Sequence, residues 1–372
     1  MHILWLNPYH GGSHAAVAEG YAQHSRHTVT LLTLPPPGGW RWRMRGAAIT
    51  FARMVRTLAS PPDVLVTTDM LDLATFRALS RDCCPPWLPM ALYFHENQLT
   101  YPLPAERRRD MSFGWINYTS ALTADRILFN SAFHQRSFLE ALPPMLTRQH
   151  DYPEIEQIAP IAAKSSVLPP GIDLASLQPA AHEQPRRPPG PPILLWNSRW
   201  EYDKQPDAFF TALAALEARG IDFRLIVAGE HIDPTAPEFV TAYKRWQHRV
   251  LHWGYAPDRA SYRRLLWHAD IVVSTAIQEF FGIGIMEALF CGCVPVLPRR
   301  LSYPELLPSA THADCLYDGP ADLVDRLQQS IQDLAQLRQY DWQALAQPYA
   351  WSHMAPRYDA AFAAMVPPCS PR

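Results

Sequence analysis

The sequence lacks the strong net charge, the long apolar runs and the N-terminal basic segment that would mark a nucleic-acid-binding, membrane or secreted protein. The net charge is only -2 at pH 7 and the isoelectric point is near 6.7, which excludes an overall basic nucleic-acid binder but not a local basic patch. No apolar run reaches the roughly 18 residues of a membrane-spanning helix. Residues 1–6 lack a basic segment and read directly as a strand, so we expect no signal peptide, no stable membrane insertion and a cytoplasmic protein.

Motifs for common cofactors are also missing. The absence of GxGxxG argues against a dinucleotide site. There is no DxD pattern and no cluster of His and Asp, so we expect no metal ion and no cofactor. The six cysteines lack zinc spacing, which is typical of reduced thiols in a cytosol. Lysine occurs only at Lys164, Lys204 and Lys244, so an isolated lysine in a polar loop is a candidate functional residue.

Alternating strand and helix patterns predict an α/β protein of two domains. A length of 372 residues with 48% hydrophobic content fits two domains of ordinary size. Short apolar runs separated by helical patterns are typical of parallel, doubly wound sheets. We expect strands at 2–7, 29–34, 63–68, 90–94, 126–129, 166–168, 193–197, 224–228, 250–254, 271–274 and 294–297.

Proline marks the boundary between the domains. The prolines within 179–192 cannot continue a helix or a central strand, so this segment is predicted to be a linker. We predict an N-terminal domain at 1–178 and a C-terminal domain at 193–348. The remaining residues, 349–372, are expected to form a helix and tail near the hinge.

The stretch 278–289 is the strongest candidate for a ligand site. A buried strand at 271–274 leads through glycines into a helix expected at 283–291. Backbone N–H groups at a helix N-terminus favour an anion such as a phosphate. Glu279 precedes this helix and Glu287 lies about one turn inside it, so the two carboxylates would bind the sugars on either side of a diphosphate. The alternative is that both glutamates lie on a solvated helix face.

Two cations follow the first strand of the C-terminal domain. Because the carboxyl ends of parallel strands meet at one edge of a sheet, Arg199 and Lys204 are expected near the glycine turn at 282–284. A guanidinium, an ammonium and helix N–H groups would together neutralise a diphosphate without a metal ion. Alternatively, the two cations pair with Glu201 and Asp203.

Polar residues also follow two strands of the N-terminal domain. The string 7–14 ends the first strand, and its pair Gly11 and Gly12 either permits a tight turn or lets an acceptor approach the backbone. His95 follows the strand at 90–94, where open α/β sheets keep their sites. It either contacts a sugar or phosphate or has a structural role.

Arginines form two candidate phosphate patches. Arg41, Arg43 and Arg45 alternate with tryptophans ahead of an amphipathic helix, a pattern that suits phosphate contact and base stacking. The arginines at 107–109 form a second patch on an expected loop. In both places the alternative is solvated charge.

Several of these strings together resemble known enzymes. The pair Arg199 and Lys204, the pair Glu279 and Glu287, and the string 170–173 resemble retaining glycosyltransferases of family 4. The resemblance extends over almost the whole chain and narrows to the tRNA-queuosine mannosyltransferase group. The strings that carry it lie at 7–14, 94–102, 116–121 and 199–204.

The resemblance implies a GT-B fold, in which two Rossmann-like domains face each other across a cleft. It also implies transfer of mannose from GDP-mannose with retention at the anomeric carbon, and catalytic roles for His95, Arg199, Lys204 and Glu279. His95 would lie by the transferred sugar. The implied donor contacts are Arg199 and Lys204 to the diphosphate, Glu279 to sugar hydroxyls, Glu287 to the ribose, and backbone N–H groups of Phe281, Gly282 and Ile283.

The implied acceptor is the cyclopentenediol of queuosine in a tRNA anticodon loop. Such enzymes are described by a front-face mechanism, in which the leaving phosphate helps to deprotonate the acceptor, so no nucleophile is assigned. Ser198 departs from the wider family, where glycine commonly precedes the arginine at this site. The acceptor-binding residues expected on this basis are Asn7, Tyr9, His10, Gly11, Gly12, His14, Asn97, Arg41, Arg43 and Arg45.

Three other functions remain open at this point. A family 4 enzyme could act on a lipid or polysaccharide acceptor, with residues 40–56 as a basic amphipathic helix on a membrane. A sugar-nucleotide epimerase shares the fold and needs no acceptor. A non-catalytic RNA-binding protein on this scaffold is the third, although intact Arg199, Lys204 and both glutamates argue against it.

Overall fold

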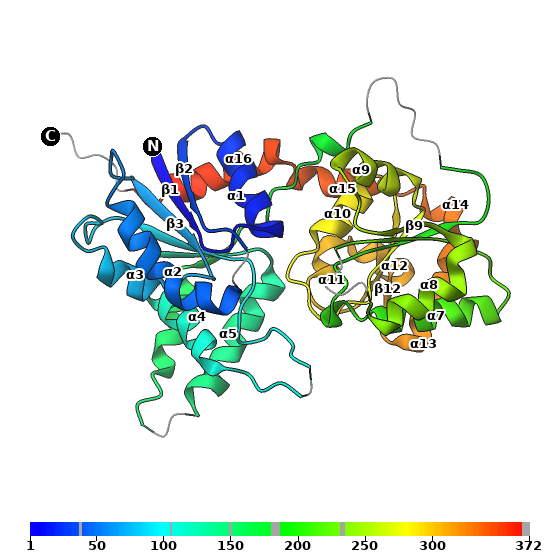
Figure 1. Cartoon of the computed structure of the whole chain (residues 1–372), viewed down its shortest axis with the longest axis horizontal. Helices are drawn as coiled ribbons and strands as arrows, with labels where there is room; N and C mark the ends of the chain where they lie inside the picture. Colours follow the sequence, from blue (N-terminus) through cyan, green and yellow to red (C-terminus); the bar gives the residue numbers. More distant parts are fainter. Residues whose placement is uncertain (37–38, 105, 149–150, 180–186, 231–234, 367–372) are drawn as a thin grey trace. The chain divides into compact units, whose positions relative to one another are not determined.

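The chain folds into two compact units. The computed structural model describes residues 1–36, 39–104, 106–148, 151–179, 187–230 and 235–366. One unit comprises Met1–Ile172 with Trp351–Arg372, and the other comprises Asp173–Ala350 (Figure 1). Half of the predicted linker (180–186) and the end of the predicted tail (367–372) lie outside the described residues.

The first unit is built on a six-stranded parallel sheet. Its strand order is β2-β1-β3-β4-β5-β6, so the direction of winding reverses between β1 and β3. Such a reversal is a topological switch point, where open α/β sheets leave a crevice for ligands. The strands are β1 (His2–Asn7), β2 (Thr28–Thr33), β3 (Val64–Thr68), β4 (Met90–Phe94), β5 (Arg126–Phe129) and β6 (Ser165–Val167).

Helices cover both faces of this sheet, which explains why its inner strands β1, β3, β4 and β5 are buried along almost their whole length. Side chains alternate along β1. Ile3 and Trp5 pack in one core with α1 and α16, whereas Leu4 and Leu6 pack in the other with α2. The helices are α1 (Gly12–His24), α2 (Trp40–Val55), α3 (Leu73–Leu79), α4 (Met111–Thr123), α5 (Ala132–Leu146), α6 (Ile158–Ala163) and α16 (Trp351–Ala363).

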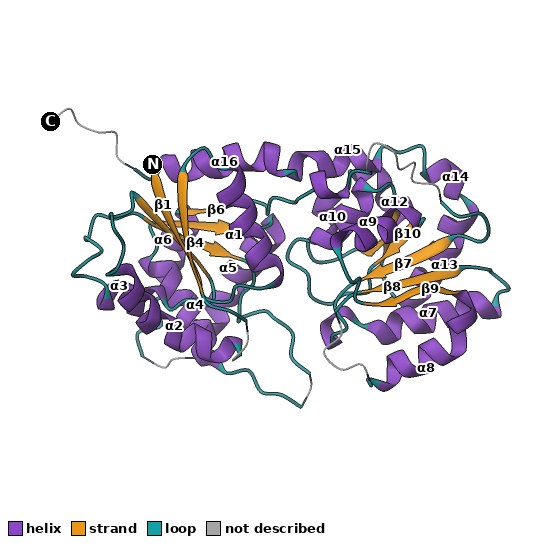
Figure 2. Ribbon diagram, turned by 45° about the horizontal axis from the view of Figure 1, so that its top comes forward, coloured by secondary structure: helices purple, strands orange, loops and turns teal. Residues whose placement is uncertain are grey.

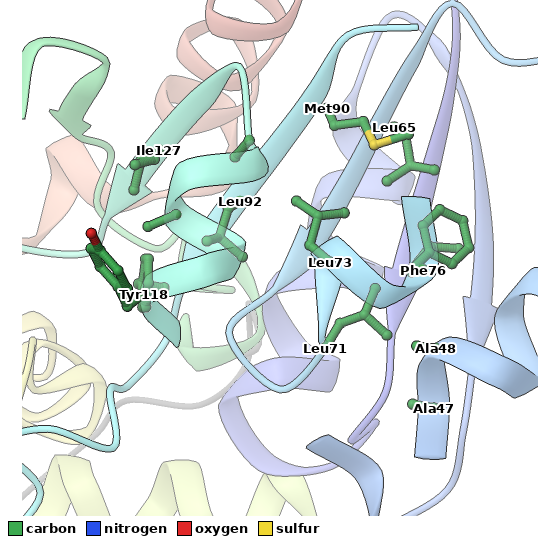
Figure 3. Close-up of a cluster of buried hydrophobic side chains, with 14 of the residues drawn as sticks. Ala47, Ala48, Leu65, Leu71, Leu73, Phe76, Met90, Leu92, Tyr118 and Ile127 are labelled. Atoms are coloured by element: carbon green, nitrogen blue, oxygen red, sulfur yellow. The ribbon is translucent and has the colours of Figure 1, made fainter. Parts of the chain in front are cut away.

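Helix α2 contributes its small residues to the second of these cores. In the cluster of buried side chains that Figure 3 shows, Ala47 and Ala48 lie at the same end as Phe76 and Leu71. Phe51, one turn further along α2, is fully buried in the same cluster. Full burial of a side chain of this size stabilises a fold by roughly 1.5–3 kcal/mol, so the apolar face of α2 is committed to the core.

The second unit repeats the design with a different strand order. Its six parallel strands run β12-β11-β10-β7-β8-β9, which places the switch point between β7 and β10. The predicted α/β class with two doubly wound parallel sheets is therefore confirmed. The strands are β7 (Ile193–Asn197), β8 (Arg224–Ala228), β9 (Val250–Gly254), β10 (Ile271–Val273), β11 (Val294–Pro298) and β12 (Leu316–Tyr317).

Helices again lie on both faces of the sheet, as Figure 2 shows for α7 and α8 on one side and α9 and α10 on the other. The sequence prediction missed β12, which at two residues is too short for a periodic pattern. The helices are α7 (Pro206–Ala218), α8 (Pro237–Trp246), α9 (Arg259–His268), α10 (Ile283–Phe290), α11 (Tyr303–Leu306), α12 (His312–Cys315), α13 (Pro320–Gln332), α14 (Leu334–Leu337) and α15 (Trp342–Ala346).

Local sequence signals account for where several helices begin. Ser131 caps α5 by accepting from the backbone of the third helical residue, and Asp258 caps α9 in the same way. Pro206 is the first residue of α7, where its missing N–H costs nothing. Asp110 caps α4, which starts at Met111. Within the described residues, no helix is long and apolar enough to cross a bilayer.

Candidate active site

The switch point of the second sheet gathers the predicted donor residues. β7 ends at Asn197 and runs into the loop that carries Arg199 and Lys204. β10 is the neighbour of β7, and the segment after it carries Glu279 before α10 begins. Because ligands of open α/β sheets bind at the carboxyl ends of strands beside the switch point, this edge is the candidate active site of the unit.

Helix α10 begins immediately after a glycine in the left-handed region. Gly282 has a φ of +107°, a conformation that residues with a Cβ rarely adopt. Its carbonyl accepts from the amide of Ile285, so the N–H of Ile283 lies at the open N-terminal end of the helix. The Ser302 hydroxyl donates to the Phe281 carbonyl at 2.9 Å and holds the turn. This geometry suits an anion at the end of the helix.

Lys204 is almost completely buried and surrounded by acceptors. Its Nζ donates to the Gln278 carbonyl at 2.7 Å and lies 3.4 Å from Glu279 Oε2 and 3.2 Å from Asp203 Oδ2. Burial by itself disfavours the ammonium, but Glu279 and Asp203 outweigh it and raise the pKa of Lys204 above its ordinary value. The lysine is therefore protonated at neutral pH and ties the loop after β7 to the segment after β10.

Arg199 follows a close approach between two backbone segments. A Cβ on Gly229 would lie only 1.8 Å from the Ser198 carbonyl oxygen, so the loop after β7 fits against β8 only because residue 229 is glycine. The Arg199 guanidinium contacts both carboxylate oxygens of Glu201 at 3.1 Å, while about half of its side chain remains exposed. The alternative pairing with Glu201 is thus present, and it leaves the guanidinium accessible at the surface.

Glu287 lies in a hydrogen-bonded chain that the sequence did not predict. The Tyr262 hydroxyl donates to Glu287 Oε2 at 2.7 Å, and Asn197 Nδ2 donates to the Tyr262 oxygen, also at 2.7 Å. Arg259 Nη2 lies 2.9 Å from Glu287 Oε1. Burial, followed by Glu287, raises the pKa of Tyr262 well above its usual value, so its hydroxyl stays a donor. Glu287 itself is buried, which excludes the solvated helix face for it.

This chain leads to the first prediction, which concerns Tyr262. Replacing Tyr262 with Phe removes the donor to Glu287 and the acceptor for Asn197 while keeping the ring. For GDP, the ligand that the resemblance implies, we expect the Kd to rise about tenfold or more, since one hydrogen bond to a charged group contributes roughly 1.5–3 kcal/mol. Isothermal titration of GDP would measure this. The matched control is Tyr255→Phe, since Tyr255 is 70% exposed in the same unit. Equal affinities for the two variants would remove Tyr262 from the site.

In the first unit, a second polar group lies at the carboxyl ends of β1, β3 and β4. His95 is buried, and its ring lies against that of His14 with centroids 4.0 Å apart. Burial, followed by His14 and His134, lowers the pKa of His95 well below its ordinary value, so the ring is neutral. Its Nε2 makes no hydrogen bond to any residue that the structure describes. A buried ring nitrogen in this state is suited to a ligand hydroxyl.

Asp69, at the end of β3, positions the backbone of His95. One of its carboxylate oxygens accepts from the amide of His95 at 2.8 Å and from that of Glu96 at 3.4 Å. The side chain is fully buried, and burial together with nearby Glu96 raises the pKa of Asp69 well above its ordinary value. The next turn is held by Asn117, whose side chain donates to the Asp69 carbonyl and accepts from the amide of Gln98.

The loop after β1 folds back on itself through its own side chains. Asn7 Nδ2 donates to the His14 carbonyl at 2.9 Å and lies 3.0 Å from His10 Nδ1. The rings of Tyr9 and His14 meet edge-on with centroids 6.0 Å apart. Gly12 has a φ of +51°, as a tight turn requires. The loop thus brings together the acceptor candidates Asn7, Tyr9, His10, Gly11, Gly12 and His14.

The loop that follows His95 is braced from within. The Asn97 Oδ1 accepts from the amide of Leu99 at 3.1 Å, so this oxygen shapes the turn. Arg109 donates to the carbonyls of Gln98 and Tyr101, both at 2.6 Å. The predicted phosphate patch at 107–109 is therefore wrong for Arg109, whose guanidinium is occupied by backbone carbonyls, while its two neighbours are exposed.

The three predicted arginines of α2 differ in their surroundings. Arg41 is exposed. Arg43 is half-buried and donates to the Pro35 carbonyl at 2.9 Å. Arg45 is exposed and lies 3.0 Å from Asp110, an ion pair that water screens strongly because both side chains are about half exposed. Arg41 and Arg45 are thus the accessible members of the group.

Several residues of the site were missed by sequence reasoning. Asp69 and Asn197 end buried strands, which is a signal that could have found them. Tyr262 and Arg259 lie on α9, where nothing in the sequence marks them as partners of Glu287. In the part of the chain that the structure describes, no group of three or more His, Cys, Asp or Glu side chains is placed to hold a metal ion.

Comparisons with known proteins place this geometry in context. Residues 2–172 match the family described as tRNA-queuosine alpha-mannosyltransferase N-terminal, and residues 178–342 match glycosyl transferases group 1. The chain is 33% identical over 318 residues to the tRNA-queuosine alpha-mannosyltransferase of Drosophila melanogaster, covering 82% of each chain. It is 24% identical over 348 residues to a GDP-mannose-dependent alpha-(1-6)-phosphatidylinositol dimannoside mannosyltransferase of Mycobacterium tuberculosis, covering 92% of this chain and 83% of that one.

Solved structures resemble the whole chain. Sucrose-phosphate synthase from Thermosynechococcus elongatus has a TM-score of 0.69 at 15% identity and covers 98% of this chain and 100% of its own. Anabaena HepE in complex with UDP and glucose has a TM-score of 0.68 at 16% identity and covers 97% of this chain and 99% of its own. At such identities the likeness concerns the fold alone, and it confirms the predicted GT-B architecture.

Proposed function

The chain belongs to the tRNA-queuosine alpha-mannosyltransferase family of glycosyltransferases, and from this premise we propose that it transfers mannose from GDP-mannose to queuosine in tRNA. The observation that carries the proposal is the 33% identity to the Drosophila enzyme over 82% of the chain. With tRNA as its acceptor, the enzyme would act in the cytoplasm.

The second unit is proposed to hold the donor. Lys204 and Arg199 would neutralise the diphosphate together with the N–H groups at the start of α10, including those of Gly282 and Ile283. Glu279, half-buried beside Lys204, would accept from sugar hydroxyls. Preorganised positive groups of this kind act most strongly when charge develops on the leaving diphosphate, which makes them catalytic without a metal ion.

The proposed donor contacts include Glu287 on the ribose. Both of its carboxylate oxygens already have protein partners, Arg259 and Tyr262. A carboxylate has about four acceptor positions, so a ribose hydroxyl can share it with these two donors. Arg259 and Tyr262 would then hold the Glu287 carboxylate in one orientation, with its remaining acceptor positions available to the ribose hydroxyl.

The proposed reaction keeps atoms and charge balanced. A hydroxyl oxygen of the queuosine cyclopentenediol forms a bond to the anomeric carbon of mannose, on the face from which the diphosphate departs. The bond from that carbon to the diphosphate oxygen breaks, the hydroxyl proton passes to a diphosphate oxygen, and GDP leaves. Protonated Lys204 stabilises the charge on GDP, and neutral His95 is proposed to hydrogen-bond to the transferred sugar.

The test is direct incubation of the full chain with GDP-mannose and queuosine-containing tRNA. Mass analysis of the digested nucleosides should show queuosine heavier by one hexose. Replacing GDP-mannose with UDP-glucose and replacing the tRNA with one that lacks queuosine are the two controls. If the chain binds GDP but transfers no hexose to queuosine, the glycosyltransferase fold and its donor site stand, and queuosine is excluded as the acceptor.

A second candidate, a lipid-linked acceptor, is favoured by one observation. The mycobacterial relative at 24% identity is named for a phosphatidylinositol dimannoside. The higher identity to the Drosophila enzyme favours tRNA. Offering the same donor with a phosphatidylinositol mannoside in vesicles separates the two, because a lipid enzyme would mannosylate the vesicle and leave queuosine unchanged.

The second prediction concerns the arginines of α2 and tRNA. Removing Arg41 and Arg45 together should weaken tRNA binding and flatten its salt dependence, by roughly 0.7–0.9 in log–log slope for each phosphate that is no longer neutralised. Filter binding at several salt concentrations would measure both quantities. Arg43→Ala should change the slope less, since the Arg43 side chain is half-buried and donates to the Pro35 carbonyl. An unchanged slope in the double variant would place the RNA surface elsewhere.

A further inference from the structure

The exposed surface of α2 carries a tryptophan held flat against the helix. Trp42 is 66% exposed, although tryptophan is usually among the more buried residues. A Cβ on Gly46 would lie 2.7 Å from Trp42 Cε2 and 2.9 Å from Cζ2, so the indole extends over the bare backbone of Gly46. Because residue 46 has no side chain, the indole ring of Trp42 can pack against the helix backbone.

Arginines share the exposed surface of α2 with this ring, and they also have contacts within the protein: Arg41 lies over the ring of Trp40, and Arg45 pairs with Asp110 and lies over Phe113. Trp42, Arg45, Ile49 and Arg53 follow one another at spacings of three or four residues, which places them on one face of the helix. Arg41 adjoins Trp42, and the sequence of α2 contains no acidic residue. An exposed aromatic ring on a helix surface that also carries arginines is the combination that single-stranded nucleic acids bind, through base stacking and phosphate contact.

A membrane is a poorer match for the same surface. A helix that lies in a bilayer interface needs a broad apolar face turned outward. The apolar face of α2 is instead buried in the core, with Phe51 and Val55 among its members. Only Trp42 and Ile49 remain as large exposed apolar side chains on this helix.

We propose that Trp42 is a stacking platform for an unpaired nucleobase of the acceptor RNA, with Arg41 and Arg45 contacting the phosphates on either side of that base. This inference rests on the proposed function, because it takes the single-stranded loop of a tRNA as the ligand. It goes beyond that function by assigning a base-binding position on the outer face of α2.

The experiment compares Trp42→Ala with Trp42→Phe in the full chain, using a synthetic anticodon stem-loop that carries queuosine. Trp42→Ala should weaken binding roughly tenfold, which corresponds to about 1.4 kcal/mol, while Trp42→Phe should retain most of the affinity. The salt slope should stay as in the unmodified chain, because stacking releases no counterions. The Kd for GDP should also be unchanged.

The matched control is Trp87→Ala. Trp87 is 81% exposed in the same unit and lies outside α2, so its loss tests for a general effect of removing a surface tryptophan. Equal RNA affinity of Trp42→Ala and Trp87→Ala would overturn the inference. So would loss of binding to phosphatidylserine vesicles in Trp42→Ala with RNA binding unchanged, which would indicate a membrane surface.

The inference and the proposed function fail in different ways. If the unmodified chain mannosylates queuosine and Trp42→Ala has the same RNA affinity, only the platform is overturned. If the unmodified chain binds no RNA and modifies no queuosine, the proposed function fails and the platform fails with it. Because both tryptophan side chains are largely exposed, neither substitution should change the melting temperature, and melting curves of the two variants would check this.

Discussion

Replacing Lys204 with Ala is expected to lower kcat/KM for mannosyl transfer by about 10²–10³-fold, equivalent to roughly 2.7–4 kcal/mol of transition-state stabilisation. The reason is that the ammonium is buried and its charge is retained at neutral pH by Glu279 and Asp203. A positive charge fixed in a partly desolvated site acts most strongly on charge that develops as the diphosphate leaves. Steady-state kinetics with GDP-mannose as the varied substrate would measure the decrease.

Two further variants make the result for Lys204 interpretable. Lys244→Ala removes an exposed lysine of α8 in the same unit and should leave kcat/KM unchanged. Lys204→Gln removes the charge and retains an N–H donor on a slightly shorter side chain, so it should lose nearly as much activity as Lys204→Ala while melting closer to the unmodified chain. Full turnover in Lys204→Gln would show that the charge of this residue plays no part in the reaction.

The second large effect is expected for Gly229→Ala. The new Cβ would lie 1.8 Å from the carbonyl oxygen of Ser198 and 2.7 Å from its carbonyl carbon, and backbone atoms cannot rotate away as a side chain can. The loop that carries Arg199 must therefore move as a whole. We expect a decrease of about 3 kcal/mol in the free energy of unfolding and much weaker GDP binding, measured by denaturant titration and calorimetry.

The matched control for this glycine is Gly220→Ala. Gly220 also has a positive φ, +71°, but a Cβ there would meet nothing within 4 Å. Its substitution should cost only about 1–2 kcal/mol for the left-handed backbone and should leave GDP binding unchanged. If the two variants were equally stable and bound GDP equally well, the approach between residues 198 and 229 would not hold Arg199 in place.

The sequence carried the positions of most strands because the rules that govern them are local. Buried parallel strands are short apolar runs, and all eleven predicted runs form strands in the structure, some displaced or shortened by a residue. The positions of the candidate sites could be predicted from the same local pattern. Polar residues that follow a buried strand must lie at its carboxyl end, which is how His95, Arg199 and Lys204 were found.

What the sequence could not supply is which distant residues share a hydrogen bond. Glu287 was identified from its spacing to Glu279, whereas its partners Tyr262 and Arg259 come from another helix. Arg109 illustrates the opposite error. Its neighbours suggested a phosphate patch, but folding brings it against the carbonyls of Gln98 and Tyr101.

The sequence by itself thus determined the fold class, the family resemblance and the donor-site candidates, because hydrophobic periodicity and short motifs are properties of neighbouring residues. Only the tertiary structure decided which charges are accessible. Arg41 and Arg43 are two residues apart in sequence, yet the first is exposed and the second bonds to Pro35. Trp42 is exposed because the chain packs the opposite face of α2 into the core, and such a choice depends on residues far apart in sequence.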